Sequence, residues 1–192
     1  MAPELYHRTG ATKIPYGPHD PIYPQCGAMY DPGTLVDIDG VFAYLGEVGW
    51  KPASIAMVGF CMGGRVSFLA AARRKFAASV GMYGLGIVTA LPLFPKNFPS
   101  LLSEVPTLKT PWLGLFGDLD IGISVEDVVT LQKELVNAPV PTEIVRYPYA
   151  AHAFHTRFRP DHYVETAAKD AWERTLCWLD QYLPARPGRA GD

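Results

Sequence analysis

The chain has 192 residues, with 48% hydrophobic side chains, 19% charged side chains and a formal net charge of -2 at pH 7. These values are typical of a globular domain with a sizeable core, and they exclude an intrinsically disordered chain. Two further classes are excluded, because no basic stripe points to nucleic acid and no apolar run approaches the roughly 20 residues of a membrane span.

Residues 1–33 are predicted to form an irregular arm. Five prolines interrupt any regular element in its second part: Pro15, Pro18, Pro21, Pro24 and Pro32. A helix is predicted to start at Thr34, because Asp37 follows three residues later in a capping pattern. Apolar residues then recur at helical spacing, which extends this helix as far as Gly46 or Gly49.

An apolar strand predicted at residues 54–60 runs into the sequence Gly-Phe-Cys-Met-Gly and then into a helix that ends near Arg73. A strand that turns sharply into a helix through Gly-x-nucleophile-x-Gly is the nucleophile elbow of α/β-hydrolases, here with Cys61 in place of serine. We expect small residues to be required at Gly59 and Gly63, because neighbouring backbone comes close there. A buried structural cysteine in a glycine-rich turn is the alternative interpretation.

Three more apolar strands follow, and they alternate with helical segments. They are predicted at residues 78–83, 112–116 and 142–147. Between the first two, residues 87–109 are predicted to be a loop punctuated by prolines, with a short helical turn. Ser124 with Asp127 is predicted to cap a helix that runs to about Val136.

The last helix is predicted over residues 163–183, followed by a frayed tail over residues 184–192. One face of this helix is expected to be apolar and to carry Ala168, Trp172, Leu176 and Leu179. Apolar strands that alternate with amphipathic helices indicate an α/β fold, with a mostly parallel sheet and helices on both of its faces. We expect a single domain over residues 1–192.

Three chemically capable side chains each follow a different predicted strand: Cys61, Asp120 and His152. In parallel sheets the site lies beyond the carboxyl ends of the strands, and nucleophile, acid and histidine stand in the chain order of the α/β-hydrolase triad. The cysteine would attack a carbonyl carbon, the histidine would move the proton, and the aspartate would orient the histidine. The Met62 N–H would donate to the oxyanion.

Several residues compete for these roles. Asp118 is an alternative to Asp120, and His155 and His162 are alternatives to His152. Two aromatic residues near strand ends either line a substrate pocket or belong to the core: Tyr83 and Phe154.

The chain resembles the dienelactone hydrolase (carboxymethylenebutenolidase) family. The resemblance is carried by the segments Gly59-Phe60-Cys61-Met62-Gly63-Gly64, Gly81-Met82-Tyr83-Gly84, Gly117-Asp118-Leu119-Asp120, Ala151-His152-Ala153-Phe154 and Ala2-Pro3-Glu4-Leu5-Tyr6-His7-Arg8. It implies an α/β-hydrolase fold, a triad of Cys61, His152 and Asp120, and hydrolysis of a small lactone or carboxylic ester without a cofactor.

Two departures from the family accompany the resemblance. In the family, the segment that matches Ala2–Arg8 follows the first strands of the sheet, so the resemblance implies that this chain lacks those strands and the second oxyanion donor. The strand before Cys61 would then present an open edge, which a homodimer would cover. The family arginine after the histidine is replaced by Thr156, with Arg157 one residue further, while Arg8 matches another arginine that favours an anionic substrate.

Two alternatives to the hydrolase are a catalytically silent remnant that acts by association, and a glutaminase-like or DJ-1-like cysteine enzyme. We expect a small-molecule ester or lactone as the substrate, and neither nucleic acid nor a membrane as a partner. No Cys/His cluster has zinc-ligand spacing, so no metal is expected. Three widely spaced cysteines and a start without the apolar core of a signal peptide favour the cytoplasm.

Overall fold

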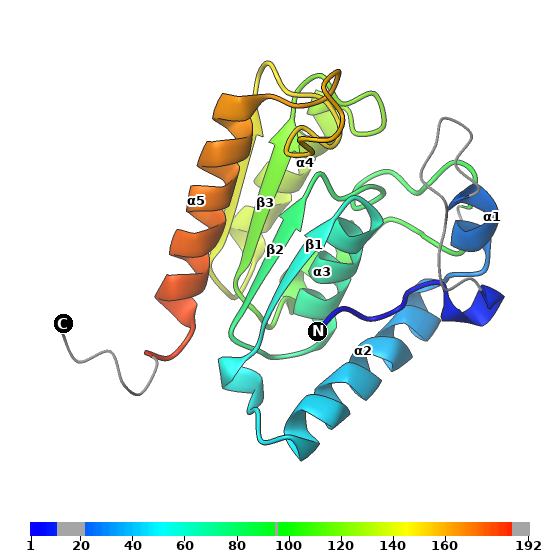
Figure 1. Cartoon of the computed structure of the whole chain (residues 1–192), viewed down its shortest axis with the longest axis vertical. Coiled ribbons are helices and arrows are strands. Elements are labelled where there is room, and N and C mark those ends of the chain that lie inside the picture. The colour runs from blue at the N-terminus through cyan, green and yellow to red at the C-terminus, as the bar shows by residue number, and fades with distance from the viewer. Residues whose placement is uncertain (11–21, 95, 186–192) are drawn as a thin grey trace.

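The fold is built on a sheet of four parallel strands. The computed structural model describes residues 1–10, 22–94 and 96–185 (Figure 1). The strands follow one another in the sheet in chain order: β1 (Ala56–Phe60), β2 (Ala78–Met82), β3 (Trp112–Gly117) and β4 (Thr142–Tyr147). They match the four predicted strands, and the parallel sheet with its helices confirms the predicted α/β fold.

In the described residues, five α-helices and four short 3-10 turns accompany the sheet. The helices are α1 (Ile22–Gly27), α2 (Asp31–Glu47), α3 (Met62–Arg73), α4 (Val125–Glu134) and α5 (Glu165–Tyr182). The 3-10 turns are η1 (His7–Thr9), η2 (Pro52–Ser54), η3 (Leu102–Thr107) and η4 (Leu135–Asn137). As predicted, the Ser124 hydroxyl caps α4 by accepting the Asp127 N–H at 3.1 Å.

The helices α3 and α5 cover opposite faces of the sheet (Figure 1). On one face, the Ser79 hydroxyl of β2 donates to the Ser67 carbonyl of α3 at 2.9 Å. On the other face, the Tyr147 hydroxyl of β4 donates to Asp170 of α5 at 2.8 Å. Consecutive parallel strands joined by right-handed crossovers place the connecting helices on one face, which leaves α5 to cover the other.

The predicted irregular arm over residues 1–33 is wrong in part, because it contains η1, all of α1 and the start of α2, while its residues 11–21 lie outside the described residues. The predicted helix start at Thr34 is also wrong, since α2 begins three residues earlier at Asp31. Pro32 is tolerated in the first turn, where its missing N–H would have no helical partner. Asp31 bonds the buried Arg65 of α3 at 2.6 Å, a tertiary contact that local sequence patterns do not predict.

The buried face of α5 differs from the predicted one by one position. The residues that pack on the sheet are Ala167, Ala171, Thr175 and Trp178. Of the predicted face, Trp172 is 49% and Leu176 is 45% exposed. Small side chains bring the helix close to the strands, and the Thr175 hydroxyl is satisfied by the Ala171 carbonyl at 2.8 Å.

The outer edge of β1 is open within the described part of the chain. The Ile55 carbonyl accepts the Ala77 N–H just before β2, and the Cys61 N–H donates to the last residue of β2. Alternation along the strand therefore points the backbone groups of Ala56, Val58 and Phe60 outward. The open edge is therefore as expected, while the homodimer that would cover it stays a prediction. None of the helices over residues 1–10, 22–94 and 96–185 is long and apolar enough to cross a membrane.

Candidate active site

Cys61 stands on a sharp turn between β1 and α3. Its backbone has φ 55° and ψ -119°, and it is the N-cap residue of α3. A non-glycine residue with positive φ is strained, and such strain persists where the surrounding contacts enforce it. The thiol is half-buried at the N-terminal end of the helix, where the backbone dipole favours negative charge. This is the geometry of the predicted nucleophile elbow.

Glycines enforce the turn by letting backbones touch. A Cβ on Gly59 would lie 1.8 Å from the Gly63 carbonyl oxygen, and a Cβ on Gly64 would lie 2.7 Å from the Gly84 Cα. A Cβ on Gly63 would meet nothing within 4 Å. The expected requirement for glycine at Gly59 is thus confirmed, whereas at Gly63 it is wrong, because Gly64 makes the close approach to the strand.

The Met62 N–H lies at the free end of the same helix. The Gly64 N–H bonds the Cys61 carbonyl at 2.9 Å, whereas the Met62 N–H donates to no group in the described residues. An unpaired donor next to a nucleophile is suited to bind an oxyanion. The Met62 side chain is buried beneath the N-terminal segment, in a cluster with Cys26, Met29 and Tyr6.

Asp120 and His152 come together beside the elbow. The Asp120 Oδ2 atom lies 2.6 Å from the His152 Nδ1 atom, and its Oδ1 atom accepts the Gly122 N–H at 2.8 Å. The Asp120 side chain is 1% exposed and that of His152 is 25% exposed. The Asp120 carboxylate is therefore held in place and shielded from solvent, while part of the His152 ring remains accessible to a substrate.

The environment of His152 favours its charged form. Burial alone would lower its pKa, but the hydrogen bond to Asp120 and the neighbouring Cys61 outweigh burial and raise the pKa to about 9. The thiol is thus close enough to act on the imidazole. A histidine that bonds a carboxylate and lies near a thiol is suited to stabilise a cysteine thiolate.

The competing residues have other partners in this structure. Asp118 forms a bidentate ion pair with Arg146 of β4, with both contacts at 2.8 Å. The His162 Nδ1–H donates to the His152 carbonyl at 2.9 Å, and His155 lies 2.6 Å from the Tyr83 hydroxyl. The geometry therefore favours Asp120 and His152 as the pair beside Cys61.

Several residues with a strained backbone lie at this site. Three non-glycine residues of the described segments have positive φ: Cys61 at 55°, Tyr83 at 39° and Ala153 at 60°. Each lies at the carboxyl edge of the sheet, after β1, after β2 or directly after His152. Such outliers are found where a site demands a particular side-chain direction.

The two predicted aromatic contacts differ in position. Tyr83 is 2% exposed, and its ring centroid lies 4.8 Å from that of His152. Burial and the nearby Cys61 raise the pKa of Tyr83. Phe154 is fully buried between Tyr83 and Tyr147, at centroid distances of 5.7 and 5.1 Å. Phe154 is therefore a core residue, and only Tyr83 reaches the histidine.

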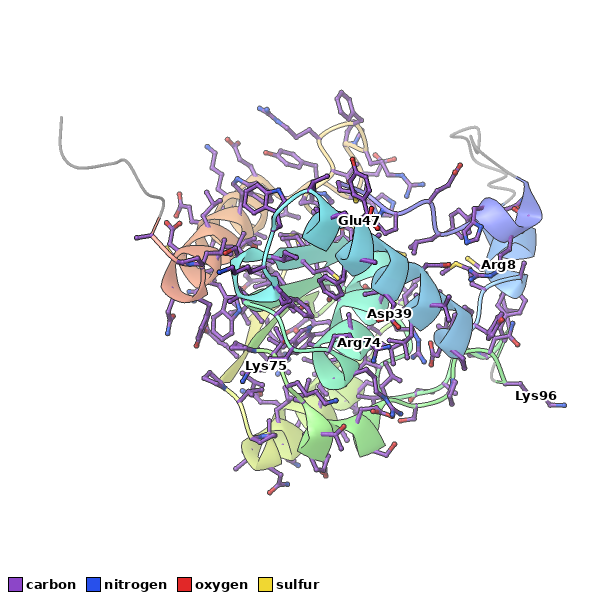
Figure 2. The ribbon with its side chains drawn as sticks, turned by 90° about the horizontal axis from the view of Figure 1, so that it is seen from below. Arg8, Asp39, Glu47, Arg74, Lys75 and Lys96 are labelled. Carbon is purple, nitrogen blue, oxygen red and sulfur yellow. The ribbon has the colours of Figure 1, made fainter. Side chains whose placement is uncertain are left out.

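Neither predicted arginine is joined to the triad in the described residues. Arg8 is paired with Asp37 of α2, with its Nη1 atom 2.5 Å and its Nη2 atom 2.7 Å from the carboxylate oxygens, and it also bonds the Gly33 carbonyl. Figure 2 shows Arg8 on the side of the molecule that carries η1 and α1. Arg157 is exposed on the loop after His152. Their roles toward a substrate stay predictions.

His155, which the sequence offered only as an alternative to His152, is a further residue of this site. Its imidazole stacks on Phe60 with centroids 4.7 Å apart, and it contacts the Tyr83 ring at 5.6 Å. Only its spacing of three residues from His152 hinted at this position. Within the described residues no group of three His, Cys, Asp or Glu side chains is placed to hold a metal ion.

Comparison with known proteins gives consistent results. The Dienelactone hydrolase family matches residues 1–183. The Yersinia pestis protein named "Putative carboxymethylenebutenolidase" is 34% identical over 183 residues, which cover 95% of this chain and 67% of the relative. A similar Salmonella typhimurium protein is 34% identical over 95% of this chain and 66% of its own length. The chain thus spans about two thirds of the length of these relatives.

Solved structures agree with the sequence comparison. The Klebsiella pneumoniae structure titled "Putative Dienelactone Hydrolase" has a TM-score of 0.79 and 34% identity, covering 94% of this chain and 74% of that chain. An alpha/beta hydrolase enzyme from a deep-sea metagenome library has a TM-score of 0.62 at 17% identity, over 77% of this chain and 64% of its own. At that identity the second likeness shows the fold alone.

Proposed function

The chain belongs to the dienelactone hydrolase family, and on that premise we propose that it hydrolyses a small lactone or carboxylic ester through Cys61, His152 and Asp120. The observation that carries the proposal is the strained Cys61 at the start of α3, beside a histidine bonded to a buried aspartate at 2.6 Å. Elbow, base and orienting carboxylate are the three parts that thiol acylation requires.

In the first half of the reaction, the Cys61 sulfur attacks the carbonyl carbon of the substrate. The electron pair of the carbonyl moves to oxygen, and the Met62 N–H donates a hydrogen bond to this oxyanion. When the bond to the alkoxy oxygen breaks, the Nε2–H of His152 protonates the leaving oxygen. A thioester on Cys61 remains, and for a lactone the leaving hydroxyl stays attached to the acyl group.

In the second half, water takes the place of the thiol. His152, now neutral, removes a proton from water as the hydroxide attacks the thioester carbonyl, and the Cys61 thiolate leaves. The carboxylic acid is released and the imidazolium is restored. Throughout, Asp120 holds the Nδ1–H side of the ring, so that Nε2 is the nitrogen that faces the thiol.

For a substrate that carries a carboxylate, we propose Arg157 rather than Arg8 as the available cation. Arg8 already has Asp37 and the Gly33 carbonyl as partners, whereas Arg157 is exposed on the loop that follows His152. Replacing Arg157 by Gln is expected to slow hydrolysis of an anionic lactone more than hydrolysis of a neutral aryl ester.

The test is hydrolysis of a dienelactone and of a simple aryl ester by the purified protein, the Cys61→Ala variant and the Cys177→Ala variant. Cys177 is exposed on α5 and serves as the matched control. We expect turnover that disappears in Cys61→Ala and is unchanged in Cys177→Ala, with the acyl group found on Cys61 by mass spectrometry. Circular dichroism checks that all three proteins are folded.

A folded protein without turnover dependent on Cys61 would overturn the proposal. That result would favour the catalytically silent remnant. Loss of one oxyanion donor lowers the rate by about 10²–10³, so a working triad would still show slow turnover. Hydrolysis of glutamine amides in place of esters would favour the glutaminase-like alternative.

A further inference from the structure

Tyr83 occupies a strained position next to the proposed base. It follows β2 directly, with φ 39°, and its N–H donates to the Leu115 carbonyl at 2.7 Å. Its ring is nearly enclosed and meets the His152 ring at an interplanar angle of 63°. An aromatic ring forced into this backbone conformation indicates that its direction matters to the site.

The Tyr83 hydroxyl has His155 as its partner. The oxygen lies 2.6 Å from the His155 Nδ1 atom, a short distance for a hydrogen bond between side chains. Burial lowers the pKa of His155, which favours the neutral ring, whose Nδ1 can accept the hydroxyl proton. His155 is itself held by stacking on Phe60, with an interplanar angle of 17°.

We propose that His155 is a positioning residue for this reaction: by accepting the Tyr83 hydrogen bond, it holds the Tyr83 ring against His152 and keeps that imidazole aligned between Asp120 and Cys61. Asp120 fixes one nitrogen of His152, but a single hydrogen bond leaves the ring free to swing about it. A rigid neighbour restricts that swing, and small misplacements of a catalytic group lower the rate. The inference rests on the proposed function, because it assigns His152 the role of base.

Thr156 is a second candidate partner for the same hydroxyl. The dominant effects of burial and of Cys61 raise the pKa of Tyr83, and Thr156 acts in the opposite direction, which places it near the Tyr83 hydroxyl. His155 is favoured as the partner because the distance is short and because its ring also touches Phe60. The Thr156→Val variant separates the two possibilities.

The test uses a set of matched variants. His155→Phe keeps a ring on Phe60 but removes the acceptor, Tyr83→Phe removes the donor, and His155→Asn restores an oxygen near the position of Nδ1. His7→Phe is the control, since His7 bonds Asp37 at 3.1 Å on the outside of α2. We expect kcat to fall about two- to tenfold in His155→Phe with KM little changed, to recover in His155→Asn, and to be unchanged in His7→Phe.

The double variant tests whether the two residues act as a unit. If they do, His155→Phe combined with Tyr83→Phe lowers kcat no more than either single change. Multiplied losses, an unchanged kcat in His155→Phe, or a loss reproduced by Thr156→Val alone would overturn the proposal.

A readout without turnover separates this inference from the proposed function. NMR titration of the His152 ring is expected to show its pKa fall from about 9 in His155→Phe and recover in His155→Asn. If the wild type hydrolyses nothing but this shift occurs, the proposed function fails, while the alignment of the His152 ring through His155 and Tyr83 is still shown. If hydrolysis depends on Cys61 but the titration of His152 does not change, the positioning role fails and the function stands.

Discussion

The two faces of the sheet differ in how they position the site residues Cys61 and His152. On the α3 face, backbone meets backbone through glycines, as at Gly59 and Gly64, and there is no room for even a methyl group. On the α5 face, contacts are made by side chains, and β1 is left partly uncovered, with Phe60 38% exposed. The position of Cys61, the proposed nucleophile, is therefore fixed by the main chain, whereas that of His152 depends on packed rings and hydrogen bonds.

The difference extends to charge. On the α3 face, the fully buried Arg65 bonds Asp31 and the carbonyls of Gly86 and Pro99, which ties α2 and two loops to the elbow helix. On the α5 face, the Arg174 pair with Asp170 is solvent-exposed. The Arg65 contacts of the elbow helix are thus expected to tolerate little substitution, and the exposed Arg174 pair to tolerate more.

The largest effect is expected at the glycine contact. Replacing Gly59 by Ala would set a Cβ 1.8 Å from the Gly63 carbonyl, so the turn must open, and we expect a loss of more than about 4 kcal/mol of unfolding free energy. Gly63→Ala is the matched control and should leave stability unchanged or slightly higher, because its Cβ has free space and alanine favours a helix. Urea unfolding measures both, and equal losses would contradict the comparison.

Breaking the buried ion pair is expected to come next. Arg65→Met leaves the Asp31 carboxylate buried without its partner and should cost about 3–5 kcal/mol. Arg74→Met removes an exposed pair, with Asp39 of α2 2.5 Å away (Figure 2), and should cost less than about 1 kcal/mol. Denaturant melts of the two variants distinguish these outcomes, and similar midpoints would show that burial does not set the difference.

Two tryptophans of α5 compare a buried with an exposed side chain within one helix. Trp178 is 7% exposed, and its replacement by Ala should cost about 3 kcal/mol through the cavity it leaves. Trp172 is 49% exposed, and its replacement should change stability by no more than about 0.5 kcal/mol. Thermal melts measure both changes in stability. A larger loss of stability for the Trp172 variant would mean that another part of the protein packs on this side of α5.

The smallest expected effect is the linkage of stability to the His152 proton. Its pKa is raised from 6.5 to about 9, so the stabilisation is fully present below about pH 6.5 and is lost as the pH rises through about 9. After allowance for the partly exposed ring we expect about 1–2 kcal/mol. Asp120→Asn should weaken this dependence, because Cys61 also raises the pKa, and an unchanged pH profile of stability in that variant would assign the dependence to another group.

The sequence predicted the elements whose signal is local. Four apolar strands, the elbow at Cys61 and the Ser124 cap all agree with the structure, because hydrophobic period and turn chemistry are properties of neighbouring residues. The start of α2 was wrong for the opposite reason. The carboxylate of Asp31 bonds Arg65, 34 residues away, and no local pattern reveals that partner.

The sequence by itself determined the family, the parallel α/β sheet and the order of nucleophile, acid and histidine, since these follow from motifs and periodicity along the chain. Only the tertiary structure showed that Asp118 bonds Arg146 of a neighbouring strand while Asp120 bonds His152. It also selected the stripe of α5 that is buried and joined Tyr83 to His155 across 72 residues. Such pairings depend on how the strands are brought side by side, which no short stretch of sequence encodes.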